Sequence, residues 1–497
     1  MTSLGKQAAL FDLFGGDDSS AVAPEEPLVP ADDETKKKTF GRVYTPRHIV
    51  EEILNLSGYS GEQIIGRHVI DNSCGDGAFL TEIVRRYCEE SPGGLKEDLE
   101  RFVHGIEIDD AERMKCVQRL DAVAAQYGVF DVRWDIICAD TLTVDKYDGK
   151  MDYVLGNPPY IRVHNLGKSF HHVKQFEFSQ GGMTDLYLVF YEIGLKMLAP
   201  NGVLGYITPS SFFNSLAGAP LRKYLVKNNL LEKLVDLGHY QAFTAAAYTT
   251  IAILRNNRTK ETTEVYEYDG VLKPVDVLRK DDFFFNNNFY FSTSGNLQKL
   301  REIFSLGANG RNFEVKNGFA TLADSFFIGD DLNFEHTIPV VKASTGKWTR
   351  CLFPYADEKL IPFEKLAESK ELEAYYAKNA AVLTKRSIAS PDEWHGFGRT
   401  QGIKDVYKPK VAVNTLLRDV NDIKLVPSPP GTGVYSGLYV LSELSYDEIK
   451  ALICTSDFVN YVSLLKKYKS GGYYAFSSKD LKRYLEYADA KRRSASS

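Results

Sequence analysis

The residues best suited to chemistry are Asn157, Pro158, Pro159 and Tyr160, which follow a predicted buried strand at residues 151–155. Each proline fixes its own φ and removes an N–H, so the loop offers carbonyls, an amide side chain and an aromatic ring in a rigid frame. Such a frame suits a flat molecule that carries an NH2 group. A Pro-Pro-aromatic turn after a strand is also common in ordinary loops, so the motif alone does not distinguish a catalytic loop from a structural one.

Adenine is such a flat molecule, because its ring carries an exocyclic amine. This amine is a poor nucleophile because its lone pair is delocalised into the ring. If the Asn157 side-chain oxygen and the Pro158 carbonyl accept its hydrogens, the nitrogen moves toward tetrahedral geometry and its lone pair becomes available, while Tyr160 stacks on the ring. A base inside a duplex cannot reach such a loop, so it has to be flipped out at a cost of roughly a few kcal/mol.

A strand, a glycine turn and a helix are predicted over residues 67–80, RHVIDNSCGDGAFL. This is the first unit of a doubly wound sheet, whose ligand lies at the carboxyl ends of the strands. Leu80 stands where a dinucleotide fingerprint has Gly or Ala, so NAD is disfavoured. A glycine turn by itself is weak support for any ligand.

Acidic residues end the next two predicted strands. The strand at 102–109 ends in Glu107, which can accept both ribose hydroxyls of a nucleoside, and the strand at 132–140 ends in Asp140, which can accept from the amino group of an adenine ring. Asp109 could equally be one of the acids that favour the first turn of a helix. Three acidic or amide strand ends therefore converge on one edge of the predicted sheet.

The remaining elements complete an α/β fold. A helix at 46–56 is predicted with Thr45 as its cap, and a helix from 184 to 198 is followed by a fifth strand at 202–208. Two closing strands, at 234–237 and 249–254, flank Phe243. This alternation predicts a doubly wound, mostly parallel sheet covered on both faces, followed by a separate α+β domain.

The ordered set YTP, DNSCGDGAFL, GIEID, CAD and NPPY with a late Phe243 resembles the TaqI-like adenine-specific (N6) DNA methyltransferases of restriction-modification systems, over about residues 39–256. The resemblance implies a Rossmann-like methyltransferase domain with S-adenosylmethionine as cofactor and no metal. It implies that Glu107 holds the ribose and Asp140 the adenine of the cofactor. The residues that it places around the methionine part are Thr45, Asp71, Gly75 and Gly77.

For the target base, the resemblance assigns the amine to Asn157 and Pro158 in the NPPY loop, with Tyr160 and Phe243 on either side of the flipped base. Asn72 departs from the family pattern, which has Pro, and this is interpreted as a tolerated change in the stiffness of the turn.

Three other functions share parts of this pattern. NPPY also occurs in enzymes that methylate glutamine in release factors or guanine in ribosomal RNA, but these lack a large second domain. A methylation subunit of a multi-subunit restriction complex carries a helical domain before the glycine turn. A non-catalytic DNA-binding or sensor subunit is a third alternative, against which the intact NPPY and acidic strand ends weigh.

The predicted second domain, residues 291–497, supplies residue types for duplex DNA. The segments NGFAT at 317–321 and GRTQ at 398–401 resemble target-recognition sequence of the same family, and Arg399 and Gln401 can contact guanine and adenine edges bidentately. Ordinary salt bridges and loop hydrogen bonds explain each residue singly just as well. A basic cluster that suits phosphates, with solvated helix charge as its alternative, includes Lys466, Lys467 and Lys469.

Composition limits the location and the partners. The chain has 497 residues and a formal net charge of −6, and this acidic balance does not favour a nucleic-acid binder. Its six cysteines form no C-x-x-C pair. No apolar stretch reaches the roughly 18 residues of a membrane span, so a cytoplasmic protein without a membrane anchor is expected. Residues 1–38 are a predicted flexible leader, and residues 39–290 are the predicted methyltransferase domain.

Two further partners are left open. A short apolar cluster from Gln7 to Phe11 resembles peptides that dock on the bacterial sliding clamp, with a frayed helical turn or a patch packed on the domain as the alternatives. Membership of a restriction-modification system would add a cognate restriction endonuclease.

Overall fold

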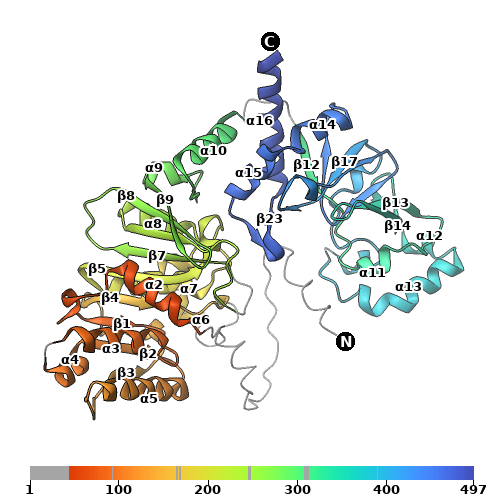
Figure 1. The fold of residues 1–497 in the computed structure, drawn as a ribbon. Helices are drawn as coiled ribbons and strands as arrows, with labels where there is room; N and C mark the ends of the chain where they lie inside the picture. Colours follow the sequence, from red (N-terminus) through yellow and green to blue (C-terminus); the bar gives the residue numbers. More distant parts are fainter. Residues whose placement is uncertain are drawn as a thin grey trace, which may run out of the picture.

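The computed structural model describes residues 44–91, 93–163, 166, 170–243, 248–306, 313–388 and 390–496. The predicted leader, with the segment from Gln7 to Phe11, lies outside the described residues. The first domain is built on a nine-stranded sheet, and a second group of smaller sheets follows it along the chain (Figure 1).

The nine strands have the order β3-β2-β1-β4-β5-β7-β6-β8-β9. Strands β1 to β5 are mutually parallel, and β7 is antiparallel to both β5 and β6. Their bounds are β1 (Val69–Asp71), β2 (Val103–Glu107), β3 (Asp135–Cys138), β4 (Met151–Gly156), β5 (Leu198–Pro209), β6 (Leu231–Asp236), β7 (Thr249–Arg255), β8 (Thr262–Tyr268) and β9 (Leu272–Arg279). The predicted doubly wound, mostly parallel sheet is confirmed.

Successive side chains of the central strands bury into two different cores, as the alternation of a strand requires. Val154 and Leu204 belong to one core with α7 and α8, whereas Leu155 and Val203 belong to the other with α2, α3 and α5. Helices therefore cover both faces. The helices of this domain are α2 (Arg47–Ser57), α3 (Ala78–Glu90), α4 (Leu95–Phe102), α5 (Asp110–Gln126), α6 (Phe170–Val173), α7 (Leu186–Met197), α8 (Ala219–Lys227) and α9 (Lys280–Phe283).

The predicted cap of the first helix is wrong. Helix α2 begins at Arg47 with Pro46 in the N-cap position and makes no side-chain cap hydrogen bond. The hydroxyl of Thr45 instead accepts a hydrogen bond from Asn157. A cap pattern read along the chain could not anticipate this partner, which is distant in sequence.

Strands β8 and β9, which the hydrophobic pattern did not indicate, extend the sheet beyond β6. They are followed by the short hairpin β10 (Phe284–Phe285) and β11 (Asn288–Phe289), and then by α10 (Ser294–Leu306). The boundary predicted near residue 290 falls between this hairpin and α10.

Beyond α10, the second domain has three further sheets of three or four strands, a two-stranded hairpin and six more helices among its described residues. Figure 1 shows α15, α16 and β23 between the nine-stranded sheet and the part that contains α13. The strands are β12 (Glu314–Asn317), β13 (Thr337–Lys342), β14 (Lys347–Leu352), β15 (Tyr355–Ala356), β16 (Lys359–Leu360), β17 (Lys410–Val413), β18 (Leu416–Leu417), β19 (Leu425–Ser428), β20 (Gly433–Tyr435), β21 (Leu438–Leu441), β22 (Tyr468–Lys469) and β23 (Tyr473–Ala475). The helices are α11 (Asp324–Phe327), α12 (Phe363–Leu366), α13 (Lys370–Leu383), α14 (Tyr446–Ile453), α15 (Ser456–Leu464) and α16 (Ser478–Ser496). The predicted additional α+β domain is confirmed.

None of the helices in the described ranges combines the length and the apolar character that a membrane crossing demands.

Candidate active site

The predicted site residues gather at the carboxyl ends of neighbouring parallel strands. Asp71 ends β1, Glu107 ends β2 and Asn157 directly follows β4, while Asp140 lies two residues beyond β3. Because these strands are adjacent in the order β3-β2-β1-β4, one edge of the sheet carries all four side chains. This is the edge at which open α/β sheets bind their ligands.

The Glu107 carboxylate organises the glycine turn after β1. Its Oε2 accepts the Gly75 N–H at 2.9 Å and its Oε1 accepts the Asp109 N–H at 2.9 Å. A carboxylate has about four acceptor positions, so one such group can hold several donors at the end of a strand. Asp109 itself caps helix α5, accepting from the Ala111 N–H, which is the helix-terminus alternative considered for it.

Two glycines of the site are required by close approach. Gly77 has φ +89°, and a Cβ there would lie 2.8 Å from the Sγ of Cys116 on α5. A Cβ at Gly156, the last residue of β4, would lie 2.6 Å from the Oδ1 of Asp71. The glycines therefore let the turn pack on α5 and let the NPPY strand pass next to the Asp71 carboxyl.

Asp71 is a buried carboxyl, only 2% exposed, and its Oδ1 accepts the Ser73 N–H at 3.0 Å. Burial raises the pKa of Asp71 from an ordinary 3.8 to about 8, with a smaller rise from the Glu107 carboxylate, while the bond from Ser73 lowers it. At neutral pH this carboxyl is therefore mostly protonated. A cation placed beside it would favour its ionised form.

Asn72, which stands where the family pattern has Pro, does more than change the stiffness of the turn. Its side chain is fully buried, and its Oδ1 accepts from the Tyr206 hydroxyl at 2.9 Å. Its backbone carbonyl accepts from the Thr141 hydroxyl at 2.7 Å. Asn72 thus ties the turn after β1 to β5 and to the segment after β3, a role that sequence reasoning missed because both partners are more than sixty residues away.

Hydrogen bonds at Asn157 tie the NPPY loop to other elements. The amide nitrogen of Asn157 donates to the Thr45 hydroxyl at 3.1 Å, which sets the orientation of the amide. The Ser73 hydroxyl reaches the Asn157 carbonyl at 3.4 Å and joins the loop to the glycine turn. Pro158 is buried and Pro159 is half-buried. The structure thus brings Thr45 to the amide of Asn157.

Tyr160 and Phe243, which the resemblance assigns to the two sides of the flipped base, have rings that lie next to each other. Their ring centroids are 6.2 Å apart and their planes meet at 74°. The Tyr160 hydroxyl donates to the Ile207 carbonyl at 3.1 Å, and burial raises the pKa of Tyr160 well above its usual value, so its ring is held as a neutral phenol. A base stacked between two rings lies parallel to both, so one of these rings has to turn before a base fits between them.

The second domain contains a groove with a volume of about 1220 Å³ that includes the NGFAT segment. Gln401 lines this groove, and its Nε2 donates to the Gly318 carbonyl at 2.9 Å. Arg399 is exposed and donates to the Ser387 and Gly398 carbonyls at 2.8 and 3.0 Å. Amide and hydroxyl side chains form much of the lining, namely Asn317, Thr321, Ser344, Gln401, Asn414, Thr415, Ser436 and Ser477.

The lysines predicted to contact phosphates are occupied within the protein. Lys466 has an 11% exposed side chain and forms ion pairs with Asp236 at 3.1 Å and Glu267 at 3.4 Å. Lys467 pairs with the buried Asp480 at 2.6 Å, and Lys469 is half-buried. This arrangement gives Lys466 and Lys467 structural partners and does not favour a phosphate role for either.

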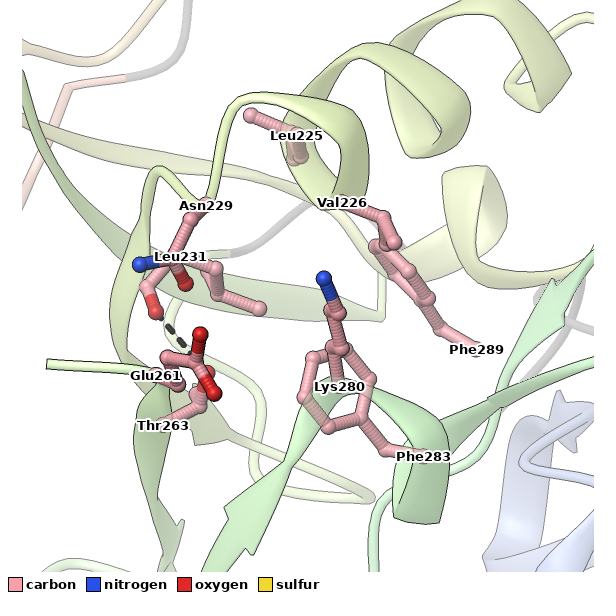
Figure 2. A pocket seen from close by; sticks show the side chains of 9 residues that line it. All are labelled: Leu225, Val226, Asn229, Leu231, Glu261, Thr263, Lys280, Phe283 and Phe289. Atoms are coloured by element: carbon pink, nitrogen blue, oxygen red, sulfur yellow. Dashed lines mark hydrogen bonds between the residues drawn. The ribbon is translucent and has the colours of Figure 1, made fainter.

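Figure 2 shows a small cavity beneath α8, between Leu225, Phe283 and Phe289. Its volume of about 10 Å³ is no more than one water molecule requires. It has no side chain in common with the edge of the sheet that carries Asp71 and Asn157. We therefore assign it to packing between the sheet and α9.

Comparisons with known proteins agree with this geometry. Residues 86–243 match the family model of the Eco57I restriction-modification methylase, which identifies this part of the chain as a methylase domain of that kind. The chain is 26% identical over 419 residues to the type II methyltransferase M.BstVI of Geobacillus stearothermophilus, covering 72% of this chain and 74% of the relative. It is 22% identical over 523 residues to the type II restriction enzyme and methyltransferase RM.Eco57I of Escherichia coli, covering 81% of this chain and 52% of the relative.

Among solved structures, the fold is similar to that of the type IIL restriction-modification enzyme MmeI in complex with DNA, with a TM-score of 0.58 and 13% identity. The similarity covers 87% of this chain and 63% of the MmeI chain, so this chain spans about half to three quarters of the length of these relatives. The resemblance to methyltransferases of restriction-modification systems is confirmed.

Proposed function

We propose that the chain is a site-specific DNA methyltransferase that transfers a methyl group from S-adenosylmethionine to the N6 amine of a flipped-out adenine. The observation that carries the proposal is the common edge of the sheet, where Asn157 lies beside the turn held by Asp71 and Glu107. The alternatives with other methyl acceptors share the NPPY loop. The second domain with its groove favours a duplex as the substrate.

The donor set fits the cofactor. Glu107 is a carboxylate at the end of β2, the residue type and position that suit ribose hydroxyls, and Asp140, which accepts the Leu142 N–H at 3.0 Å, lies beyond the end of the neighbouring strand where an adenine would meet it. The Asp71 carboxyl suits the amino group of the methionine part, because a neighbouring cation would lower its raised pKa and convert it to a carboxylate. When bound, S-adenosylmethionine supplies an electrophilic methyl group on a sulfonium.

The chain contributes positioning and lone-pair release. The Thr45 hydroxyl accepts a hydrogen bond from the amide nitrogen of Asn157. The amide oxygen of Asn157 is therefore the atom assigned to the target amine, together with the Pro158 carbonyl. Tyr160 and Phe243 would hold the base by stacking. Direct displacement at the methyl needs no covalent intermediate, so alignment of the amine is the main contribution of these residues.

Recognition of the duplex is assigned to the second domain. Gln401, in the groove, and the exposed Arg399 are of types that contact adenine and guanine edges. MmeI, whose fold is similar, was solved in complex with DNA. The relatives belong to restriction-modification systems, which makes a restriction endonuclease the partner to seek.

The test uses purified full-length protein, unmethylated bacterial DNA and S-adenosylmethionine with a labelled methyl group. Digestion to nucleosides and mass spectrometry should find the label in N6-methyladenine, and base-modification sequencing should place it in one sequence context. Label in cytosine, in RNA or in glutamine of a protein substrate would refute the proposal in favour of that acceptor. DNA binding without any transfer would favour the non-catalytic alternative.

A further inference from the structure

The second domain contacts the first at the loop that carries Phe243. We call residues 237–243, which follow β6, the target loop. We call residues 466–475, which contain β22 and β23, the bridging hairpin.

A buried cluster joins the bridging hairpin to the base of the target loop. Asp236, the last residue of β6, is 2% exposed, and its Oδ2 accepts from the Tyr468 hydroxyl at 2.5 Å and pairs with the Lys466 ammonium at 3.1 Å. Its Oδ1 accepts the Gly238 N–H at 3.0 Å. One carboxylate therefore holds the hairpin and the loop together. Burial lowers the pKa of Lys466, but Asp236 and Glu267 outweigh this and raise it overall, so the ammonium stays charged.

Aromatic rings extend this contact along the target loop. The His239 ring meets the rings of Tyr468 and Tyr474 at centroid distances of 4.9 Å each, and that of Tyr248 at 5.8 Å. Both His239 ring nitrogens are buried without a hydrogen-bond partner among the described residues. Burial lowers the pKa of His239, so a neutral ring packs among these tyrosines. Tight edge contacts of this kind leave the described part of the loop little freedom to move independently of the hairpin.

The bridging hairpin also reaches the groove of the second domain. Tyr473, at the start of β23, lines the groove, and the Arg418 guanidinium lies 4.2 Å from the centre of its ring. Backbone pairing of Ala475 with Leu416, another groove residue, continues the connection. Strand β23 therefore lies between β18, which carries the groove residue Leu416, and β22, whose Tyr468 contacts the target loop.

We propose that the bridging hairpin couples occupation of the groove to the position of Phe243, with Asp236, Lys466 and Tyr468 as positioning residues. This inference rests on the proposed function for what occupies the groove. Phe243 stands edge-to-face against Tyr160, so a base can be stacked there only after a ring turns. The base of the loop that carries this ring is held by the hairpin, so a shift of the hairpin shifts the loop.

The first test needs neither DNA nor methyl transfer. Hydrogen exchange followed by mass spectrometry compares the free full-length wild type with Lys466→Met and Tyr468→Phe. Peptides that cover Asp236 to Phe243 should exchange about tenfold faster in both variants, because breaking a buried charge pair opens the structure locally. The control Lys299→Met removes a pair of similar length, 2.8 Å to Asp457, at a distance from the loop and should leave these peptides unchanged. Unchanged exchange in the hairpin variants would overturn the proposal.

The second test uses a duplex that carries the site found by base-modification sequencing, with 2-aminopurine in place of the target adenine. The wild type should raise its fluorescence on binding. Lys466→Met and Tyr468→Phe should lose most of that rise, and on unmodified duplex should lower kcat about tenfold while the KM for S-adenosylmethionine and the Kd for duplex stay within twofold. Wild-type kcat and fluorescence in both variants would overturn the coupling. Failure of the wild type itself to transfer a methyl would instead count against the proposed function, and the exchange test would still decide whether the hairpin holds the loop.

Discussion

Asp71→Asn should remove a pH dependence that the wild-type fold carries. The buried carboxyl has a pKa of about 8 against an ordinary value of 3.8. Asparagine keeps the shape and the acceptor oxygen that receives the Ser73 N–H, and it resembles the protonated carboxyl. An exposed residue changed in the same way, Asp145→Asn, controls for the loss of a charge as such.

The direction in which the free energy of unfolding changes with pH follows from the difference between the folded and unfolded pKa values of Asp71. Below pH 3.8 the Asp71 carboxyl is protonated in both the folded and the unfolded chain, so it does not change the free energy of unfolding there. Between 3.8 and about 8 the unfolded chain ionises while the folded chain does not, so stability falls as pH rises. At about 1.36 kcal/mol per pH unit, the free energy of unfolding should drop by about 2–3 kcal/mol between pH 6 and pH 8 relative to Asp71→Asn, and then level off.

The same carboxyl should link cofactor binding to proton release. If Asp71 ionises beside the amino group of the ligand, affinity for S-adenosylhomocysteine should rise on the order of tenfold per pH unit from pH 6 to pH 8. Calorimetry in buffers of different ionisation enthalpy should detect close to one proton released near pH 6. Asp71→Asn should show neither the slope nor the proton.

Denaturant unfolding and calorimetry over pH 6–9 therefore measure one group in two ways. The same stability slope in Asp71→Asn as in the wild type would show that Asp71 does not carry the raised pKa. If the stability of the wild type falls with pH as expected but its affinity for S-adenosylhomocysteine does not change with pH, Asp71 has the raised pKa but does not belong to the cofactor site.

Four other changes have defined outcomes. Asn157→Ala should leave cofactor affinity within about twofold and lower kcat by much more than tenfold, measured by calorimetry and methyl transfer; transfer within tenfold of wild type would end the assigned role. Thr45→Val should lower kcat without unfolding the protein, because the Asn157 amide loses its orienting partner, and a kcat equal to wild type would contradict that. Arg399→Ala should cost about 1–3 kcal/mol at one base position in a comparison of single-base variants, and an equal loss at every sequence would return Arg399 to a structural role. Gly318→Ala should lower the melting temperature, because a Cβ there would lie 2.5 Å from the Val434 carbonyl, and an unchanged melting temperature would refute this packing argument.

The cofactor edge of the sheet was predictable because its signals are local. Each apolar run predicts a strand, and the acid or amide that follows it, such as Glu107 or Asn157, must stand at the same edge once the strands are parallel. Gly77 was predictable as a turn residue, although its contact with Cys116 was not. Strand β2 lies within the run predicted at 102–109, and β4 is one residue longer than the run predicted at 151–155.

The contacts that the sequence did not predict join residues far apart along the chain. Thr45 was predicted as a helix cap, but its hydroxyl is used by Asn157, 112 positions away. Lys466 was assigned to phosphates by charge clustering, yet its partner Asp236 lies in the other domain. A pattern along the chain shows that a lysine is present but not whether a carboxylate from a distant strand will bury it.

The burial of Lys466 also limits how much this lysine can attract DNA phosphates in a chain whose net charge is −6. A lysine fixed between Asp236 and Glu267 contributes little attraction for phosphates, so its removal should change the salt dependence of DNA binding little, whereas a true phosphate contact would lower the slope by about one unit. Wild-type and Lys466→Met binding measured over 50–200 mM salt separates these cases directly. A slope lower by one unit would restore the phosphate role of Lys466 and show that its ion pairs give way when DNA is bound. An unchanged slope, together with faster exchange at Asp236, would leave the lysine as the link between the two domains.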